Sequence, residues 1–372
     1  MRKQDVDAAS MSSQALAHRD GVLLIGNFLS GTGRSRAVCE DLREHLAQSG
    51  WRVYSASKRP ERLARLVDML QTIWMRRREY RAAHVEVYSG AAFVWAEAAC
   101  WLLRRIGRPY VLTLHGGALP KFAKGRAARV RHLLHSAVAV TAPSPYLLKQ
   151  MQPYRADIRL VPNALDLDRY CFRLRSPAAP RLVWLRAFHS IYNPQLAVQV
   201  LHRVSKRFPG ATLAMIGPDK GDGTFEATRA EADKLGVTDR VQFLGPCAKA
   251  EVPEMLSRGD IFLNTSNVDN TPVSVIEAMA CGLCTVSTNV GGIPDLLDHG
   301  RDSLLSPSRD ARAMADSVER ILDDPALARS LSENARAKAK LFAWTEILPR
   351  WQNLLGELTT VAKPSAGKTA AR

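Results

Sequence analysis

The sequence lacks any run of uncharged apolar residues long enough to cross a membrane as a helix. Such a helix needs about 20 residues, and the most apolar stretch, AAFVWAEAACWLL, is interrupted by Glu97. We therefore expect that stretch to form a helix in a protein core. Residues 1–19 begin with Met, Arg and Lys but have no continuous apolar segment of the kind that a secretory signal needs. The sequence thus predicts a disordered leader and a cytoplasmic location.

Cysteine is too scattered for a disulfide framework. Six cysteines occur in 372 residues, whereas small secreted domains carry them densely. Cys281 and Cys284 have the Cys-x-x-Cys spacing, but no second pair accompanies them to complete a zinc site. We expect both to pack as small apolar residues. The sequence therefore predicts a reducing compartment, with no metal and no cofactor.

Acidic residues are scarce in the first half of the chain. Residues 1–170 contain 27 Lys and Arg against 14 Asp and Glu, while residues 171–372 contain 25 against 22. The basic excess includes two clusters, Arg76–Arg81 and Lys121–Arg131. Either they belong to ordinary solvated helices, or they face anionic lipid on the inner face of a membrane, which would make the protein a peripheral one. No nucleic-acid motif or interleaved aromatic series accompanies them, so we expect no nucleic-acid partner.

Two α/β domains account for the length and the pattern of the chain. A chain of 372 residues is too long for one ordinary core, and short apolar segments alternate with helical patterns, as in parallel sheets. From the N-terminus we expect a leader at residues 1–19, a first domain at 20–170, a second domain at 178–345, a terminal helix at 346–362 and a flexible tail at 363–372.

The most informative stretch runs from Asp260 to Pro294. It predicts a buried strand, a loop, a short helix, a second buried strand and a Gly-rich loop. Pro272 suits the first turn of the helix, and Gly282 suits a left-handed residue after its end. Asp269 in the loop and Glu277 in the helix then flank the free N–H groups of a helix N-terminus. This arrangement suits a phosphorylated sugar, because the N–H groups favour phosphate and carboxylates accept from hydroxyls.

The same stretch resembles the donor-binding signature of the retaining GT-B glycosyltransferases of family 4, the glycosyl transferases group 1. The resemblance rests on Asp269, on Glu277 eight residues later, on the Ala-Met-Ala-x-Gly segment that follows, and on Gly-Gly-Ile-Pro at residues 291–294. It covers residues 20–345 and implies two Rossmann-like domains that face each other across a cleft. The implied reaction is transfer of a sugar from a nucleotide-diphosphate sugar to an acceptor hydroxyl, with the anomeric configuration retained.

The resemblance also implies roles for individual residues. Glu277 would hold the ribose, while Asp269 and backbone N–H groups near Thr271 would hold sugar hydroxyls. Arg186 would stabilise charge on the leaving diphosphate, and His115 would contact the donor sugar from the opposite domain. The other expected donor-binding residues are Gly31, Thr32, Gly33, Asn163, Tyr192, Asn270 and Pro272. The expected acceptor is a glycan or a lipid-linked sugar in cell-surface glycan or glycolipid synthesis.

Two of these positions depart from familiar phosphate-binding patterns. The loop at Gly31–Gly33 follows the first predicted strand, at the sheet edge where open α/β sheets bind ligands, but it lacks the lysine of a Walker loop. Tyr192 stands where the resembling family commonly has Lys. A tyrosine can donate one hydrogen bond to a phosphate but cannot offset its charge. The diphosphate would then depend on Arg186 alone or on a cation from elsewhere in the chain.

Two other classes of function stay open from the sequence. A sugar-nucleotide epimerase can share this two-domain architecture, and it would turn over the donor without an acceptor. A non-catalytic binder of anionic surfaces or nucleic acid would account for the basic first half. Salt-dependent binding to DNA without any binding of sugar nucleotides would favour that second alternative.

Overall fold

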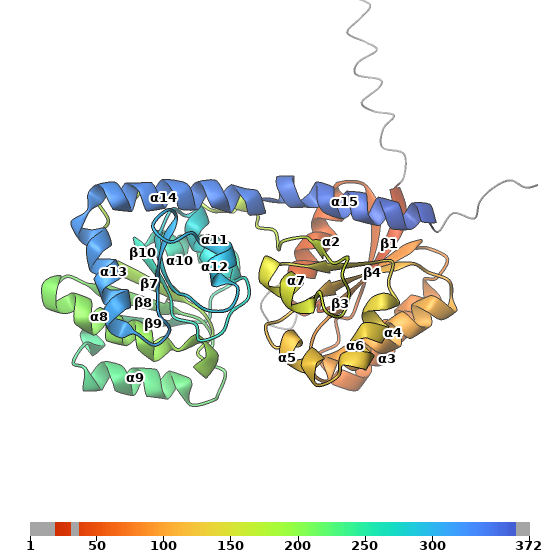
Figure 1. The fold of residues 1–372 in the computed structure, drawn as a ribbon, viewed down its shortest axis with the longest axis horizontal. Coiled ribbons are helices and arrows are strands. Elements are labelled where there is room, and N and C mark those ends of the chain that lie inside the picture. Colours follow the sequence, from red (N-terminus) through yellow and green to blue (C-terminus); the bar gives the residue numbers. More distant parts are fainter. Residues whose placement is uncertain (1–18, 31–36, 362–372) are drawn as a thin grey trace, which may run out of the picture. The chain divides into compact units, whose positions relative to one another are not determined.

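The chain forms two compact units, each built on its own parallel sheet. The structure is a computed structural model and describes residues 19–30 and 37–361. Unit 1 comprises the described residues up to Ala142, together with Met151–Val161 and those from Leu348 on, and unit 2 comprises Pro143–Gln150 and Pro162–Ile347. Each sheet has six strands (Figure 1). The prediction of two Rossmann-like domains is therefore confirmed.

Unit 1 has the strand order β2-β1-β3-β4-β5-β6, with every pair parallel. The strands are β1 (Arg19–Ile25), β2 (Trp51–Ala56), β3 (Ala82–Val87), β4 (Tyr110–Leu114), β5 (Ala139–Ala142) and β6 (Arg159–Leu160). Parallel strands covered on both faces need continuous apolar sequence. The inner strand β1 fits this rule, since Val22, Leu23 and Leu24 are fully buried.

Helices cover both faces of the unit 1 sheet. They are α2 (Val38–Gln48), α3 (Arg62–Met75), α4 (Ala92–Arg105), α5 (Leu119–Lys124), α6 (Ala127–His135) and the part of α15 (Trp344–Val361) from Leu348 on. Right-handed crossovers place α3, α4 and α6 on one face, and Figure 1 shows α2 and α15 on the other. Trp351 of α15 packs edge-on against His84 of β3, with ring centroids 5.1 Å apart. The helix predicted at residues 346–362 is thus the end of a longer helix that packs on unit 1.

Unit 2 has the strand order β12-β11-β10-β7-β8-β9. Its strands are β7 (Arg181–Leu185), β8 (Thr212–Ile216), β9 (Val241–Gly245), β10 (Ile261–Asn264), β11 (Cys284–Thr288) and β12 (Ser303–Ser306). Its helices are α7 (Pro145–Met151, up to Gln150), α8 (Pro194–Arg207), α9 (Thr224–Lys234), α10 (Val252–Ser257), α11 (Val273–Ala280), α12 (Ile293–Leu296), α13 (Ala311–Asp323) and α14 (Pro325–Ala339), with short 3-10 turns at Leu167–Arg169 (η2) and Ser190–Tyr192 (η3).

The stretch from Asp260 to Pro294 folds as its sequence predicts, with one shift. Strand β10, helix α11 and strand β11 follow one another, and β10 pairs with β11 in parallel. Gly282 has φ of 75° directly after the helix C-cap, the left-handed conformation that glycine adopts most readily. Pro272 is the N-cap rather than a residue of the first turn. All residues of α11 after Val273 are buried, so this helix is a core element at the end of a buried strand.

The described part of the chain shows no disulfide, no metal-ligand cluster and no membrane-spanning helix. All six cysteines are free thiols, and Cys281 and Cys284 are buried. Across residues 19–30 and 37–361, the structure brings together no group of three or more His, Cys, Asp or Glu that could hold a metal ion. Over the same residues, none of the helices combines the length and the apolar character needed to cross a membrane.

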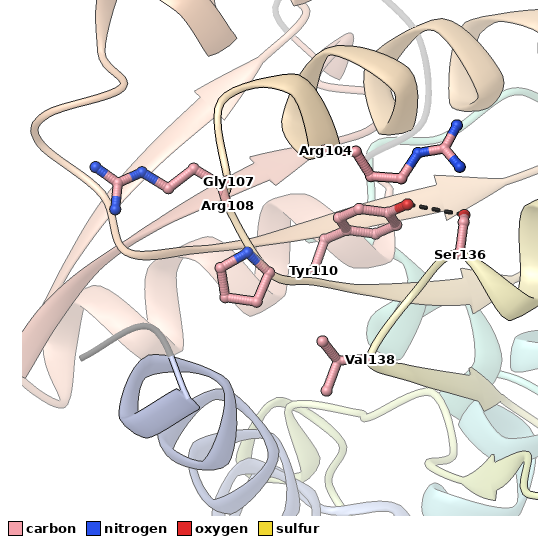
Figure 2. Close-up of a pocket in the computed structure, with 7 residues that line it drawn as sticks. Arg104, Gly107, Arg108, Tyr110, Ser136 and Val138 are labelled. Carbon is pink, nitrogen blue, oxygen red and sulfur yellow. Dashed lines mark hydrogen bonds between the residues drawn. The ribbon is translucent and has the colours of Figure 1, made fainter. Parts of the chain in front are cut away.

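A shallow pocket of about 300 Å³ opens on unit 1 where β4 begins (Figure 2). Tyr110 donates a hydrogen bond to Ser136 across it, with the two oxygens 2.8 Å apart. The pocket lies at the amino ends of β4 and β5. Open α/β sheets bind ligands at the opposite, carboxyl ends of their strands.

Candidate active site

Arg186 and Asp269 meet at the carboxyl edge of the unit 2 sheet. Arg186 directly follows β7, and Asp269 lies in the loop after β10. These two strands are neighbours, and neighbouring parallel strands end at the same edge. The Arg186 guanidinium makes an ion pair with the Asp269 carboxylate. The structure thus joins two residues that are 83 positions apart in the chain and that the sequence assigned to one site.

The Asp269 loop is held rigidly by its surroundings. Ser266 donates its hydroxyl to Oδ2 of Asp269 at 3.1 Å, and the Asn270 N–H donates to Oδ1 at 2.9 Å. The Gly292 N–H donates to the Asp269 carbonyl at 3.0 Å. A Cβ at Gly291 would lie 2.0 Å from that same carbonyl oxygen. The glycine pair of Gly-Gly-Ile-Pro is therefore required for the loop to pack, because no side chain fits there.

Tyr192 stacks on Arg186 and does not supply a second cation. The Arg186 guanidinium carbon sits 4.7 Å from the centre of the Tyr192 ring. Such stacking is a cation–π contact, and it orients the guanidinium without adding charge. Among the described residues, Nε of Arg186 is buried and has no hydrogen-bond partner. Arg186 therefore keeps donor capacity for a ligand.

Glu277 forms a second charged pair, which the sequence did not predict. Its carboxylate is only 5% exposed, and Oε1 accepts a hydrogen bond from the Tyr170 hydroxyl at 2.8 Å. Nζ of Lys249 lies 3.0 Å from the same oxygen. Lys249 is in the turn between β9 and α10. It carries no local motif, and only the crossover that leads from β9 back to β10 brings it to α11.

The N-terminus of α11 lies between the two charged pairs in the chain. The first N–H groups of any helix have no acceptor within the helix. Here the Val275 and Ile276 N–H groups turn back to the Pro272 carbonyl. Within the described chain, the buried hydroxyl of Ser274 has no partner. Asn270 and Thr271 are half-buried in the preceding loop. A phosphate at this terminus would find N–H donors and the positive end of the helix dipole.

His115 belongs to unit 1 and lies at the carboxyl end of β4. Its ring stacks on Tyr88, with centroids 5.0 Å apart. Its Nε2 is 3.4 Å from Oε1 of the buried Glu86, a residue that the sequence did not single out. Burial lowers the pKa of His115, and the neighbouring Glu86 opposes that shift. The imidazole is therefore neutral near pH 7 and can both donate and accept a hydrogen bond.

The remaining predicted donor-binding residues are Asn163 and the loop at Gly31–Gly33. Gly31, Thr32 and Gly33 fall outside the described residues. Asn163 is half-buried in the segment between β6 and η2 and is grouped with unit 2. The structure therefore gathers Arg186, Asp269, Asn270, Tyr192 and Glu277 within one unit. His115 belongs to the other.

His84 shows how strongly the centre of the unit 1 sheet excludes charge. Nε2 of His84 is 2.7 Å from the Thr113 hydroxyl, and the ring is buried. Burial, with a smaller contribution from His115, lowers the pKa of His84 to about 3. The folded state therefore holds this histidine neutral, while the unfolded chain protonates it near pH 6.5.

We expect this difference to make folding stability fall as the pH drops from about 6.5 toward 3. One such histidine contributes a slope of at most about 1.4 kcal/mol per pH unit. His84→Gln should lower the slope, because an amide does not titrate and can still donate to Thr113. Urea unfolding at pH 7, 5.5 and 4.5 measures it, with His132→Gln on the exposed surface of α6 as control. Equal slopes for the wild type and His84→Gln would contradict this account.

Two models of known protein families match the chain. A model described as Glycosyltransferase Family 4 matches residues 35–169, and one described as Glycosyl transferases group 1 matches residues 179–338. Together the two matches support a group 1 glycosyltransferase. The second match contains Arg186, Tyr192, Lys249, Asp269 and Glu277.

Solved structures of other proteins share the fold of this chain. Sucrose-phosphate synthase from Thermosynechococcus elongatus superposes with a TM-score of 0.75 at 20% identity, covering 92% of this chain and 100% of that one. Anabaena HepE in complex with UDP and glucose gives 0.74 at 16% identity, covering 91% and 100%. At such identities the likeness shows the fold alone. That fold is GT-B, with two Rossmann-like domains.

Relatives of known activity align over part of their length. N-acetyl-alpha-D-glucosaminyl L-malate synthase of Bacillus anthracis is 28% identical over 243 residues, which cover 61% of each chain. D-inositol 3-phosphate glycosyltransferase of Mycobacteroides abscessus is 32% identical over 179 residues, which cover 46% of this chain and 40% of that one. The alignments thus span less than two thirds of these relatives.

Proposed function

We propose that the protein transfers a sugar from a nucleoside-diphosphate sugar to an acceptor hydroxyl, with the anomeric configuration retained. The observation that carries this proposal is the pairing of Arg186 with Asp269 beside the N-terminus of α11. A guanidinium and free N–H groups suit a diphosphate, and the nearby carboxylates suit sugar hydroxyls. The HepE structures, one of which holds UDP-glucose, show that a neighbour of the same fold binds this class of donor.

In this proposal the ion pair between Arg186 and Asp269 opens when the donor binds. Arg186 turns to the diphosphate and stabilises the charge that develops as the sugar leaves, and Asp269 is released to accept from a sugar hydroxyl. Preorganised charge of this kind is usually the largest single contribution to catalysis. Glu277 holds the ribose hydroxyls.

A panel of nucleotide sugars tests the proposal. Calorimetry with UDP-, GDP- and ADP-linked hexoses identifies the donor, and NMR of the product reports the anomeric configuration. We expect turnover of the donor to require an acceptor. Turnover to an epimeric sugar nucleotide without any acceptor would instead favour an epimerase, and an inverted anomeric product would refute retention.

The acceptor side of the proposal is a sugar or lipid presented on an anionic membrane. Supporting it, Leu63, Val67 and Trp74 form one stripe along α3 at helical spacing, and Leu63 is 80% exposed. Arg77 lies over the Trp74 ring at 4.2 Å. On the neighbouring helix α4, Trp101 is also exposed. Exposed aromatic and aliphatic side chains rimmed by arginine match the composition of helices that lie in a lipid interface.

Charge favours lipid as the occupant of this surface, which we call the α3–α4 face. The sequence has no Asp or Glu between Glu97 and Asp157, and the face is flanked by Arg76, Arg77 and Arg78. Each basic residue near an anionic leaflet is worth about 1 kcal/mol. Several such residues suffice for reversible binding that salt weakens.

We expect co-sedimentation with anionic but not neutral vesicles, at low but not high salt. Changing Arg76, Arg77 and Arg78 to Ser should lower the bound fraction several-fold, as should Leu63→Ser with Trp74→Ser. The matched control removes three exposed arginines from unit 2, as Arg229→Ser, Arg258→Ser and Arg329→Ser. Equal binding to both lipids would indicate a soluble acceptor instead. So would an equal loss of the bound fraction in the unit 1 and unit 2 triple-arginine variants.

A further inference from the structure

Lys249 is a charged residue of the site region that neither a motif nor the family resemblance assigns. Its turn follows β9, the edge strand of the unit 2 sheet, and leads into α10. The next strand in the chain is β10, on the far side of β8 and β7. The connection must therefore cross over the sheet, and this crossing places the Lys249 ammonium 3.0 Å from Glu277.

The two partners of the ion pair between Lys249 and Glu277 differ in their exposure to solvent. Lys249 is 35% exposed while Glu277 is 5% exposed, so the lysine reaches in from solvent to a buried carboxylate. Water therefore screens the lysine side of the pair, while the carboxylate is desolvated. Tyr170 already donates to the same oxygen at 2.8 Å. The carboxylate would thus stay hydrogen-bonded if the lysine left.

Where the resembling family commonly has a second cation, this chain has Tyr192. A nucleoside diphosphate carries at least two negative charges, and Arg186 supplies one guanidinium. The neutral Tyr192 ring is stacked on Arg186 and leaves no room in that contact for a cation. Lys249 is held by the carboxylate that the proposed function assigns to the ribose. The ribose and the α-phosphate are directly bonded in a nucleotide. The flexible four-carbon side chain of Lys249, which lies at Glu277, can therefore reach from the ribose to the phosphate.

We infer that Lys249 binds the diphosphate of the donor and takes the role of second cation that Tyr192 cannot fill. The inference rests on the proposed function. In the free protein Lys249 neutralises Glu277. When the nucleotide enters, the ribose hydroxyls donate to Glu277, and the ammonium moves from the carboxylate to the phosphates. In the free protein, both cations thus form ion pairs with carboxylates, Arg186 with Asp269 and Lys249 with Glu277.

Calorimetry with UDP and uridine separates phosphate binding from ribose binding. If UDP is the nucleotide bound, Lys249→Gln should weaken UDP about tenfold and uridine less than twofold, because only UDP carries phosphate. The dependence of UDP affinity on salt should become shallower as well. Lys234→Gln is the matched control, since Lys234 pairs with Glu231 on the surface of α9. It should change neither affinity.

A rescue experiment makes the assignment sharper. Tyr192→Lys in the Lys249→Gln background should restore most of the UDP affinity by placing a cation beside Arg186. Tyr192→Phe in the same background keeps the stacked ring without charge and should restore nothing. Equal losses for UDP and uridine, or no loss in Lys249→Gln, would overturn the assignment while leaving the proposed function standing. A wild-type protein that bound none of UDP, ADP and GDP would refute the proposed function and this assignment with it.

Discussion

Replacing Arg186 with Ala should lower kcat by about 10²- to 10³-fold, the loss seen when one preorganised charge-stabilising group is removed from an active site. The structure places the guanidinium directly on Asp269 and against the Tyr192 ring. Without it the leaving diphosphate would develop charge beside an unpaired carboxylate. The expected readout is turnover of the nucleotide sugar under saturating donor and acceptor.

Arg207→Ala is the control for this substitution. Arg207 also pairs with carboxylates, Glu319 and Asp323, but on the exposed surface between α8 and α13. It should leave kcat unchanged. Thermal unfolding followed by circular dichroism checks that both variants fold. An Arg186→Ala protein that folds and turns over at the wild-type rate would remove Arg186 from the mechanism.

Glu277→Gln should weaken nucleotide binding by about 10- to 100-fold and reduce turnover to a trace. A hydrogen bond to a charged acceptor is worth about 1.5 to 3 kcal/mol, and the amide lacks the charge that ribose hydroxyls would meet. Calorimetry with the nucleoside diphosphate measures the affinity, and a coupled assay for the released nucleotide measures turnover. Unchanged kinetics would show that Glu277 is not a site residue.

Glu277→Gln should leave the fold intact. Glu277 is buried, so a change of shape there would disturb the core around Ile276 and Met279. Glutamine keeps the shape, and its carbonyl can still accept from Tyr170. The ion pair with half-exposed Lys249 is screened by water. We therefore expect a small change in Tm. Glu277→Ala should lower Tm clearly more, because it leaves a cavity and removes the carboxylate that Tyr170 contacts.

The sequence alone determined the elements around the site. A run of β-branched and apolar residues, a loop with Asp269, and a helix closed by Gly282 follow from local preferences, and they fold as β10, α11 and β11. The two domains follow from chain length and from the alternation of strands with helices. These features depend on residues close together in the chain, so a pattern can reveal them. The shift of Pro272 to the N-cap is the usual uncertainty of a helix boundary.

Only the tertiary structure decided which distant side chains meet. Lys249 reaches Glu277, and Glu86 reaches His115. Neither contact has a local signal. Each depends on which strands lie side by side in the sheet and on where the connections between them cross. The carboxyl edge of a parallel sheet thus collects loop residues from all along the chain, and their chemistry becomes one site only after the sheet is assembled.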